Sequence, residues 1–251
     1  VLLGALDAGY TFFDTAAVYG LGHNETLVGE VLGPRRSEFV LASKCGITDA
    51  TGTKRGIDGR PETIKALCDV SLRRLQTDVI DLYYLHRWDK AVPIEDSVGA
   101  LAELVQAGKI RSIGLSEVSA ATLRRACAVH PIAALQTEYS PWTRNPEIAV
   151  LDACHELDVT FVAFSPVGRG FLAGGARSAD FAEGDMRAAM PRFQGEAFAA
   201  NLRLLARFEA LAKDAGCPPA QLCLAWLMAK DPALVSIPGT TSPDHMLENA
   251  A

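Results

Sequence analysis

Four side chains capable of proton-transfer chemistry stand at, or just after, the ends of short apolar runs: Asp14, Tyr19, Lys44 and His86. Hydride addition to a carbonyl group creates an alkoxide, which needs a nearby acid of suitable strength. A free phenol is too weak an acid, but an adjacent buried ammonium lowers the pKa of a phenol by stabilising the phenolate. A carboxylate beside the ammonium keeps it charged and oriented. These residue types therefore predict a proton-delivery set.

The predicted roles are Tyr19 as proton donor, Lys44 as the ammonium, Asp14 as its carboxylate and His86 as a neutral imidazole that orients a carbonyl oxygen. Each residue alone also has a structural interpretation, as a helix cap, a loop anchor, a solvated amine or a core histidine. Their position after three successive apolar runs favours the functional interpretation.

The elements that must position these residues alternate between strands and helices. Helix-period stretches include residues 61–75, 94–109, 119–130, 148–157 and 201–216. Polar residues follow nearly every strand and no half of the chain repeats, which favours a (β/α)₈ TIM barrel over a doubly wound sheet. We therefore expect a single barrel domain over residues 1–251. The seven apolar, β-rich runs are residues 10–14, 39–44, 79–86, 110–116, 133–140, 160–166 and 234–239.

Two features depart from a regular barrel pattern. The chain opens on what resembles the tail of a helix, so we expect the first βα unit to be missing from the sequence. An irregular stretch rich in Gly, Ala and Arg runs from Gly168 to Glu196. Long loops of this kind at a barrel mouth are usually functional.

Composition limits the classes of partner. A net charge of -6 with both signs interspersed argues against nucleic acid. No apolar run is long enough for a membrane span, and the first residues lack the basic start of a secretory signal. The six cysteines form no C-x-x-C pair and the five histidines form no metal-binding pattern. We expect a cytoplasmic protein with no metal, no membrane and no nucleic acid partner.

Seven strings together resemble the aldo-keto reductase superfamily, in the microbial and plant branch that reduces small aldehydes and ketones. The resemblance covers almost the whole chain in order and implies the barrel fold. It also implies that Asp14, Tyr19, Lys44 and His86 form the catalytic tetrad, with a small-molecule carbonyl compound as substrate. The strings are FFDTAAVYG, LASKCG, YYLHRWD, IGLSE, LQTEYSPW, VAFSPVGRGFL and IPGTTSPDHMLENA.

The resemblance further implies a nicotinamide cofactor. Ser116 and Gln136 match the residues that bind the nicotinamide carboxamide, with Glu117 where many relatives have asparagine. Phe164 matches the aromatic residue that stacks on the nicotinamide ring. The predicted pyrophosphate contacts are Ser165, Pro166, Gly168, Gly170 and Leu172.

The last string resembles the region that holds the adenosine 2′-phosphate and adenine. Well-known members have a lysine where Gly239 stands and an arginine where His245 stands, and both cations favour NADPH. A neutral histidine selects the 2′-phosphate less strongly than arginine does. We expect NADPH, with NADH as the alternative. The implied contacts are Gly239, Thr240, Thr241, His245, Glu248 and Asn249.

Val18, Trp88 and Trp142 flank the predicted tetrad and are expected to line the substrate pocket, although either tryptophan could serve packing instead. Two other functions stay open. Lys44 could be the Schiff-base lysine of an aldolase, or the chain could be a redox-sensing regulatory subunit that binds nicotinamide. The sequence does not indicate the oligomeric state.

Overall fold

The computed structural model describes residues 1–49 and 55–251. These residues form two compact units. The first comprises residues 1–137, 146–162 and 240–250, and the second comprises residues 138–145, 163–239 and 251. The single-domain organisation over residues 1–251 stays a prediction.

Each of the seven apolar runs forms a strand, and the strands hydrogen-bond in the order β1-β2-β5-β6-β7-β8-β9. The pairs β1/β2, β2/β5, β5/β6 and β6/β7 are parallel, as predicted. Because helices cover such strands, their residues are buried on both faces, most completely in β5. The bounds are β1 Phe12–Asp14, β2 Val40–Cys45, β5 Ile80–Leu85, β6 Ile110–Ser116, β7 Ala134–Glu138, β8 Thr160–Phe164 and β9 Val235–Ile237.

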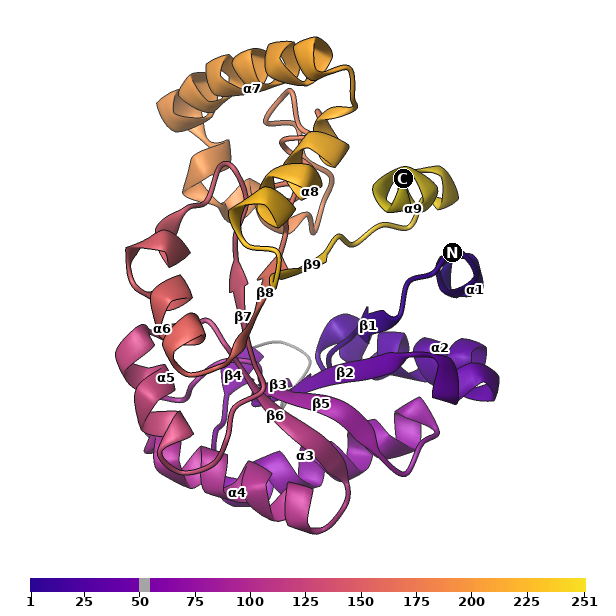
Figure 1. The fold of residues 1–251 in the computed structure, drawn as a ribbon, viewed down its shortest axis with the longest axis vertical. Helices are drawn as coiled ribbons and strands as arrows, with labels where there is room; N and C mark the ends of the chain where they lie inside the picture. The colour runs from indigo at the N-terminus through magenta and orange to yellow at the C-terminus, as the bar shows by residue number, and fades with distance from the viewer. Residues whose placement is uncertain (50–54) are drawn as a thin grey trace. The chain divides into compact units, whose positions relative to one another are not determined.

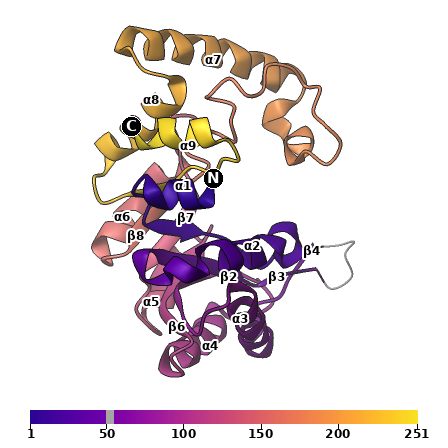
Figure 2. The same ribbon diagram turned by 90° about the vertical axis from the view of Figure 1, so that its right-hand side faces the viewer.

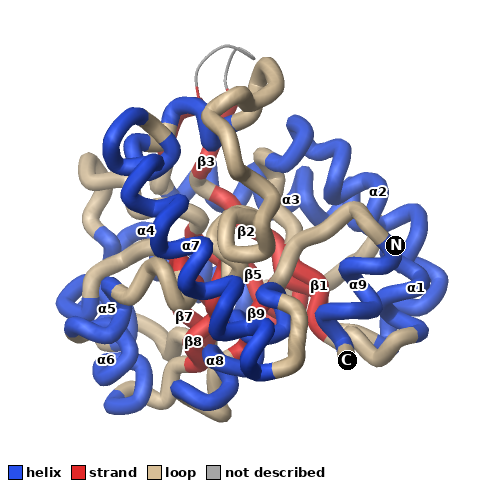
Figure 3. The backbone as a smooth tube through the Cα atoms, turned by 90° about the horizontal axis from the view of Figure 1, so that it is seen from above, coloured by secondary structure: helices blue, strands red, loops and turns tan. Residues whose placement is uncertain are grey.

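Helices follow the strands of the first unit, and α3 and α4 lie outside β5 and β6 (Figures 1 and 3). Helix α3 covers the predicted residues because Pro61 opens it and Gln76, at φ 53°, ends it in a left-handed conformation. The α-helices of the first unit are α1 Leu2–Asp7, α2 His23–Leu32, α3 Pro61–Leu75, α4 Ile94–Gln106, α5 Ala120–Cys127, α6 Val150–Glu156 and α9 Pro243–Ala250. The 3₁₀ helices with residues in this unit are η1 Tyr19–Gly22, η2 Gly33–Glu38 and η3 Asn145–Ile148.

A small hairpin was not predicted. Strands β3 Ile47–Asp49 and β4 Arg55–Ile57 pair antiparallel, with Ile47 opposite Ile57. Each strand has three residues, which is too short to show an alternating pattern in the sequence.

The second unit contains helices α7 Gly195–Ala215 and α8 Pro219–Lys230. The stretch from Gly168 to Glu196, predicted to be irregular, contains two short 3₁₀ helices, η4 Met186–Ala189 and η5 Pro191–Phe193. Phe193 anchors the stretch by packing against Phe171, with ring centroids 5.9 Å apart. Both rings belong to a buried cluster, and α7 contributes Phe198 and Leu205 to it.

Close packing between β5 and β6 depends on Gly114. A methyl group at this position would lie 2.3 Å from the ring of Tyr84, which is fully buried. We expect Gly114→Ala to destabilise the protein by about 1–3 kcal/mol, because neither the ring nor the strand has room to move. Denaturant unfolding measures this loss. Gly99→Ala is a matched control, since Gly99 lies in α4 with open space around it and should gain about 0.5–1 kcal/mol.

Helices α1 and α9 lie side by side in the first unit (Figure 2). The Tyr10 hydroxyl, which follows α1, donates to the Met246 carbonyl at 2.8 Å. A Cβ on Gly4 would meet the Met246 side chain at 3.2 Å. The helix predicted to hold the adenosine end of a cofactor is therefore anchored on the opening helix. Within the described residues, no helix combines the length and the apolar character that crossing a membrane requires.

Candidate active site

The carboxyl ends of parallel strands carry the predicted tetrad. Asp14 ends β1, Lys44 lies near the end of β2, and His86 directly follows β5. The sheet ladder continues into the loops, since the His86 N–H donates to the Cys45 carbonyl at 2.9 Å. All four tetrad residues belong to the first unit, and the structure brings them together.

Lys44 is held by two acceptors. Its ammonium forms a very short ion pair with Asp14 and donates to the Thr15 carbonyl at 2.8 Å. The Lys44 side chain is fully buried, and Asp14 is 9% exposed. A buried ammonium needs such compensation, because an unpaired charge there costs several kcal/mol. Pairing with the Asp14 carboxylate suits an ammonium, whereas an aldolase lysine attacks as a neutral amine, so this ion pair argues against the aldolase interpretation.

Tyr19 lies against this ammonium. The Lys44 Nζ is 5.0 Å from the centroid of the Tyr19 ring. Tyr19 is 40% exposed, so a ligand can reach it. The structure therefore gives Tyr19 both a cation beside its ring and access for substrate.

His86 faces the same phenol. The two ring centroids are 6.0 Å apart and the rings are nearly perpendicular, at 87°. His86 is 9% exposed, which restricts the ring to few orientations. This arrangement suits an imidazole that directs a carbonyl oxygen toward Tyr19.

Gln136 connects the tetrad to the predicted carboxamide site. Its amide nitrogen donates to the second oxygen of Asp14 at 2.9 Å, and the side chain is almost completely buried. This bond occupies an amide N–H and leaves the amide carbonyl as an acceptor. An acceptor suits the N–H₂ of a carboxamide, so the geometry fits the role predicted for Gln136.

Ser116 ends β6 opposite Gln136 in the sheet register. Its hydroxyl accepts from Arg87 at 3.0 Å, and the same guanidinium donates to the His86 carbonyl at 2.6 Å. Sequence reasoning missed Arg87, although its place directly after His86 was a usable signal. Glu117 adopts a left-handed conformation at φ 54°, and its N–H donates to the Gln136 carbonyl at 3.0 Å.

Tyr84 is a second phenol in the interior and was also missed. Lys44 Nζ lies 5.9 Å from its ring centroid, but the residue has no exposed surface. Burial, with the nearby Asp14 carboxylate, raises the pKa of Tyr84 well above the ordinary value. Tyr84 therefore stays protonated and out of contact with substrate. Side chains two positions apart in a strand point to the same side of the sheet. The spacing of Tyr84 and His86 was therefore the sequence signal that the Tyr84 side chain points to the same side as His86.

The predicted pyrophosphate segment belongs to the second unit. Ser165, Gly168, Arg169 and Gly170 all have positive φ, between 49° and 83°. Across the described residues, the backbone N–H groups of Arg169 and Gly170 meet no acceptor. Free N–H groups on left-handed backbone form concave sites for anions, so this turn fits a pyrophosphate.

Other members of this segment differ in what they expose. Pro166 is buried, and Leu172 packs in the aromatic cluster with its N–H bonded to the Val167 carbonyl at 3.1 Å. The structure thus gives the Leu172 side chain a packing role. Phe164 is half-buried, with the Arg169 guanidinium 5.8 Å from its ring centroid, so one face of this ring already has a partner.

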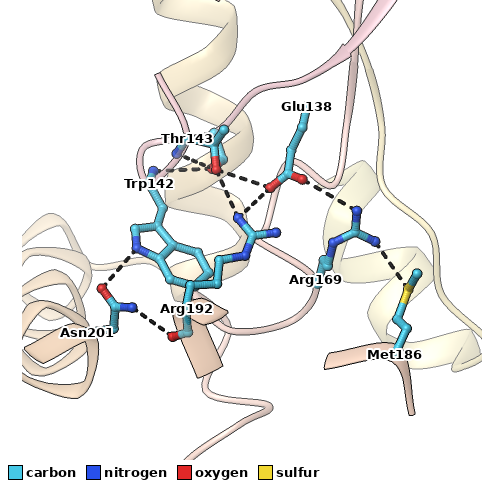
Figure 4. A network of polar contacts seen from close by, with 8 residues as sticks. Glu138, Trp142, Thr143, Arg169, Met186, Arg192 and Asn201 are labelled. Carbon is cyan, nitrogen blue, oxygen red and sulfur yellow. Dashed lines mark hydrogen bonds and ion pairs between the residues drawn. The ribbon is translucent and has the colours of Figure 1, made fainter. Parts of the chain in front are cut away.

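A polar network centred on Glu138 surrounds the segment (Figure 4). Glu138 accepts from Arg192 at 2.7 Å and from Thr143 at 3.1 Å, and pairs with Arg169 at 3.4 Å. This carboxylate therefore links the end of β7 to the segment and to η5. Sequence reasoning missed Glu138 and Arg192 because no local pattern joins them.

Trp142 belongs to the same network. Its indole stacks on Phe171 with ring centroids 4.4 Å apart, and its N–H donates to Asn201 at 3.4 Å. Its ring also packs so closely on Gly168 that a Cβ there would lie 2.9 Å away. Packing is thus a clear role for Trp142. In the first unit, Trp88 donates to the Val92 carbonyl at 2.9 Å, and Val18 is buried.

The residues predicted at the adenosine end lie before α9, in its first turn and in its last turn. Ser242 begins this helix by accepting from the His245 N–H at 3.3 Å, and its own N–H donates to the Thr240 hydroxyl at 3.1 Å. Thr241 and His245 are exposed, while Glu248 and Asn249 are half-buried. Gly239, in the second unit, has open space around its Cα. A helix start with exposed hydroxyl and imidazole groups suits a phosphate.

A metal centre was not expected. Over residues 1–49 and 55–251, no three His, Cys, Asp or Glu side chains gather in a way that could hold a metal ion.

Comparison with known proteins identifies the family. The model of the Aldo/keto reductase family matches residues 1–251. "Aldo-keto reductase yakc [NADP(+)]" from Schizosaccharomyces pombe is 45% identical over 99% of this chain and 75% of its own length. The glycerol dehydrogenase AKR11B4 from Gluconobacter oxydans has a TM-score of 0.89 at 30% identity, covering 99% of this chain and 78% of that one. An aldo-keto reductase from Klebsiella pneumoniae in complex with NADPH has a TM-score of 0.74 at 28% identity, covering 99% and 76%.

These matches and the geometry agree. Seven strands and a tetrad at or just after strand ends were predicted from the sequence, and the structural likeness confirms the predicted fold class. The chain therefore belongs to the aldo/keto reductase family and has the (β/α)₈ barrel fold of that family.

Proposed function

We propose that this protein reduces aldehydes or ketones to alcohols, with NADPH as the hydride donor and Tyr19 as the proton donor. The observation that carries the proposal is the exposed Tyr19 ring lying 5.0 Å from the buried ammonium of Lys44. Family membership and the cofactors of the relatives support the reaction class.

NADPH, when bound, would supply the hydride that the carbonyl carbon receives. The Tyr19 hydroxyl gives its proton to the carbonyl oxygen, so that the products are an alcohol and the oxidised cofactor. Lys44 stabilises the phenolate that remains, and Asp14 holds Lys44 in place. His86 orients the carbonyl oxygen before transfer. Solvent then returns a proton to Tyr19.

The residues that bind the cofactor in this proposal are those that the resemblance to the aldo-keto reductase superfamily implies. Ser116, Glu117 and Gln136 hold the carboxamide, and Phe164 stacks on the ring. The turn from Ser165 to Gly170 binds the pyrophosphate. The free backbone N–H groups of Arg169 and Gly170 support this role, because they can donate to phosphate oxygens. The residues that bind the adenosine end of the cofactor are Gly239, Thr240, Thr241, His245, Glu248 and Asn249. The residues that line the substrate site are Val18, Trp88 and Trp142. The cytoplasmic location stays a prediction.

The test is cofactor oxidation with a panel of aldehydes and ketones, comparing NADPH with NADH. We expect carbonyl-dependent oxidation, with kcat/KM for NADPH higher than for NADH by about tenfold, which corresponds to about 1.4 kcal/mol of selection at the 2′-phosphate. The preference is modest because His245 and Gly239 replace cations. Tight NADPH binding without carbonyl-dependent turnover would instead indicate the redox-sensing alternative.

A further inference from the structure

Glu25 is a buried carboxylate that the mechanism does not use. It lies in the first turn of α2, three residues after the end of the Tyr19 loop at Gly22, and has no exposed surface. Its two oxygens accept from the Ser43 hydroxyl at 2.6 Å and pair with Arg74 at 3.3 Å. A fully buried carboxylate is costly unless its partners are well placed. The positions of Ser43 and Arg74 therefore determine whether this buried carboxylate is stabilised.

Arg74 reaches the turn that carries Tyr19. A Cβ on Gly22 would lie 2.1 Å from the Arg74 guanidinium carbon, so the guanidinium lies directly against the Gly22 backbone. Three successive residues after Tyr19 are left-handed, with φ values of 56°, 56° and 92° at Gly20, Leu21 and Gly22. Leu21 is not a glycine and is 62% exposed, so its own packing does little to hold this conformation. Such a backbone persists only where neighbouring groups fix it.

The same helical turn also holds the strand that carries Lys44. Ser43, the partner of Glu25, directly precedes Lys44. Asn24 accepts from the Thr15 hydroxyl at 2.6 Å, and the Thr15 carbonyl accepts from the Lys44 ammonium. One turn of α2 thus connects the proton donor to the ammonium beside it.

We propose that Glu25 and Arg74 are positioning residues that fix Tyr19 relative to Lys44. The inference rests on the proposed role of Tyr19 in carbonyl reduction. Misplacing a reacting group by about 1 Å can lower a rate up to about a hundredfold, whereas cofactor contacts on other elements are unaffected. Loss of the pair should therefore reduce kcat more than it weakens cofactor binding.

The variants are Glu25→Gln and Arg74→Met, with Glu30→Gln and Arg73→Met as controls. Each control makes the same chemical change at an exposed position of the same helix, α2 or α3. We expect kcat per NADPH-binding molecule to fall by about tenfold in the variants and to stay within about twofold in the controls. The dissociation constant for NADPH should change by less than about threefold in all four.

The kcat is calculated per molecule that binds NADPH, which distinguishes a positioning role from a structural one. If Glu25 and Arg74 were needed only for folding, the variants would contain fewer NADPH-binding molecules, but the kcat of each such molecule would be unchanged. Ser43→Ala, which removes one donor to Glu25, is a milder variant that should lose activity to a smaller degree. Unchanged kcat in the binding-competent molecules, or in Ser43→Ala if the other two do not fold, would overturn the inference. Absence of carbonyl reduction in wild type and controls would instead overturn the proposed function.

Discussion

Replacing Tyr19 by phenylalanine should lower kcat for carbonyl reduction by about a thousandfold while the dissociation constant for NADPH stays nearly unchanged. The ring, and with it the contact to the Lys44 ammonium, is retained, and only the proton donor is removed. The measurement is steady-state cofactor oxidation together with direct cofactor titration.

Tyr84→Phe is the matched control for Tyr19→Phe. Both rings lie within 6 Å of the Lys44 ammonium, but Tyr84 has no exposed surface. We expect Tyr84→Phe to change kcat by less than about tenfold, because its hydroxyl cannot meet substrate. If Tyr84→Phe lost most turnover and Tyr19→Phe retained it, the assignment of the proton donor would be wrong.

The second large effect concerns the buried ion pair. Lys44→Met should abolish measurable reduction and destabilise the protein by about 3–5 kcal/mol, because it leaves the Asp14 carboxylate buried without its cation. Among the described residues, the Gln136 amide would still donate to Asp14. Denaturant unfolding gives the stability, and cofactor oxidation gives the activity.

A double variant separates stability from catalysis. Lys44→Met with Asp14→Asn removes both charges and should recover at least about 2 kcal/mol of the lost stability, since no charge is left unpaired. It should recover no activity, because the cation beside Tyr19 is still absent. A double variant as unstable as Lys44→Met alone would show that the two residues are not energetically coupled.

The sequence predicted the strands well, because continuous apolar runs are the local signature of a covered parallel sheet. It predicted α3 at its observed bounds, because a proline opens a stretch with helical periodicity that ends at Leu75. Helix α7 starts earlier than the predicted residue 201, at Gly195, whose φ of 49° gives no start signal in the sequence. Local signals thus predict a helix or strand correctly where both its residue composition and the residues at its two ends indicate the same element.

The proximity of the four tetrad residues could be predicted, because Asp14, Lys44 and His86 stand at or beside strand ends and Tyr19 lies in the loop after β1. The position of Arg87 after His86 and the inward direction of Tyr84 had sequence signals, but their partners, and those of Glu138, depend on sheet register and on loops distant in sequence. The absence of a Cβ at Gly114, for example, admits the Tyr84 ring only when β5 and β6 pair in the observed register. Such relations arise from tertiary packing and have no local pattern.

The anchoring of α9 on α1 has a thermodynamic consequence. Tyr10 and Met246 are 236 positions apart in the chain, yet one hydrogen bond joins them. A nucleotide that ordered α9 would bind only the folded arrangement and would therefore protect α1 from local unfolding as well. Occupancy at the adenosine end would be reported by resistance to proteolysis within α1, far from the ligand in sequence.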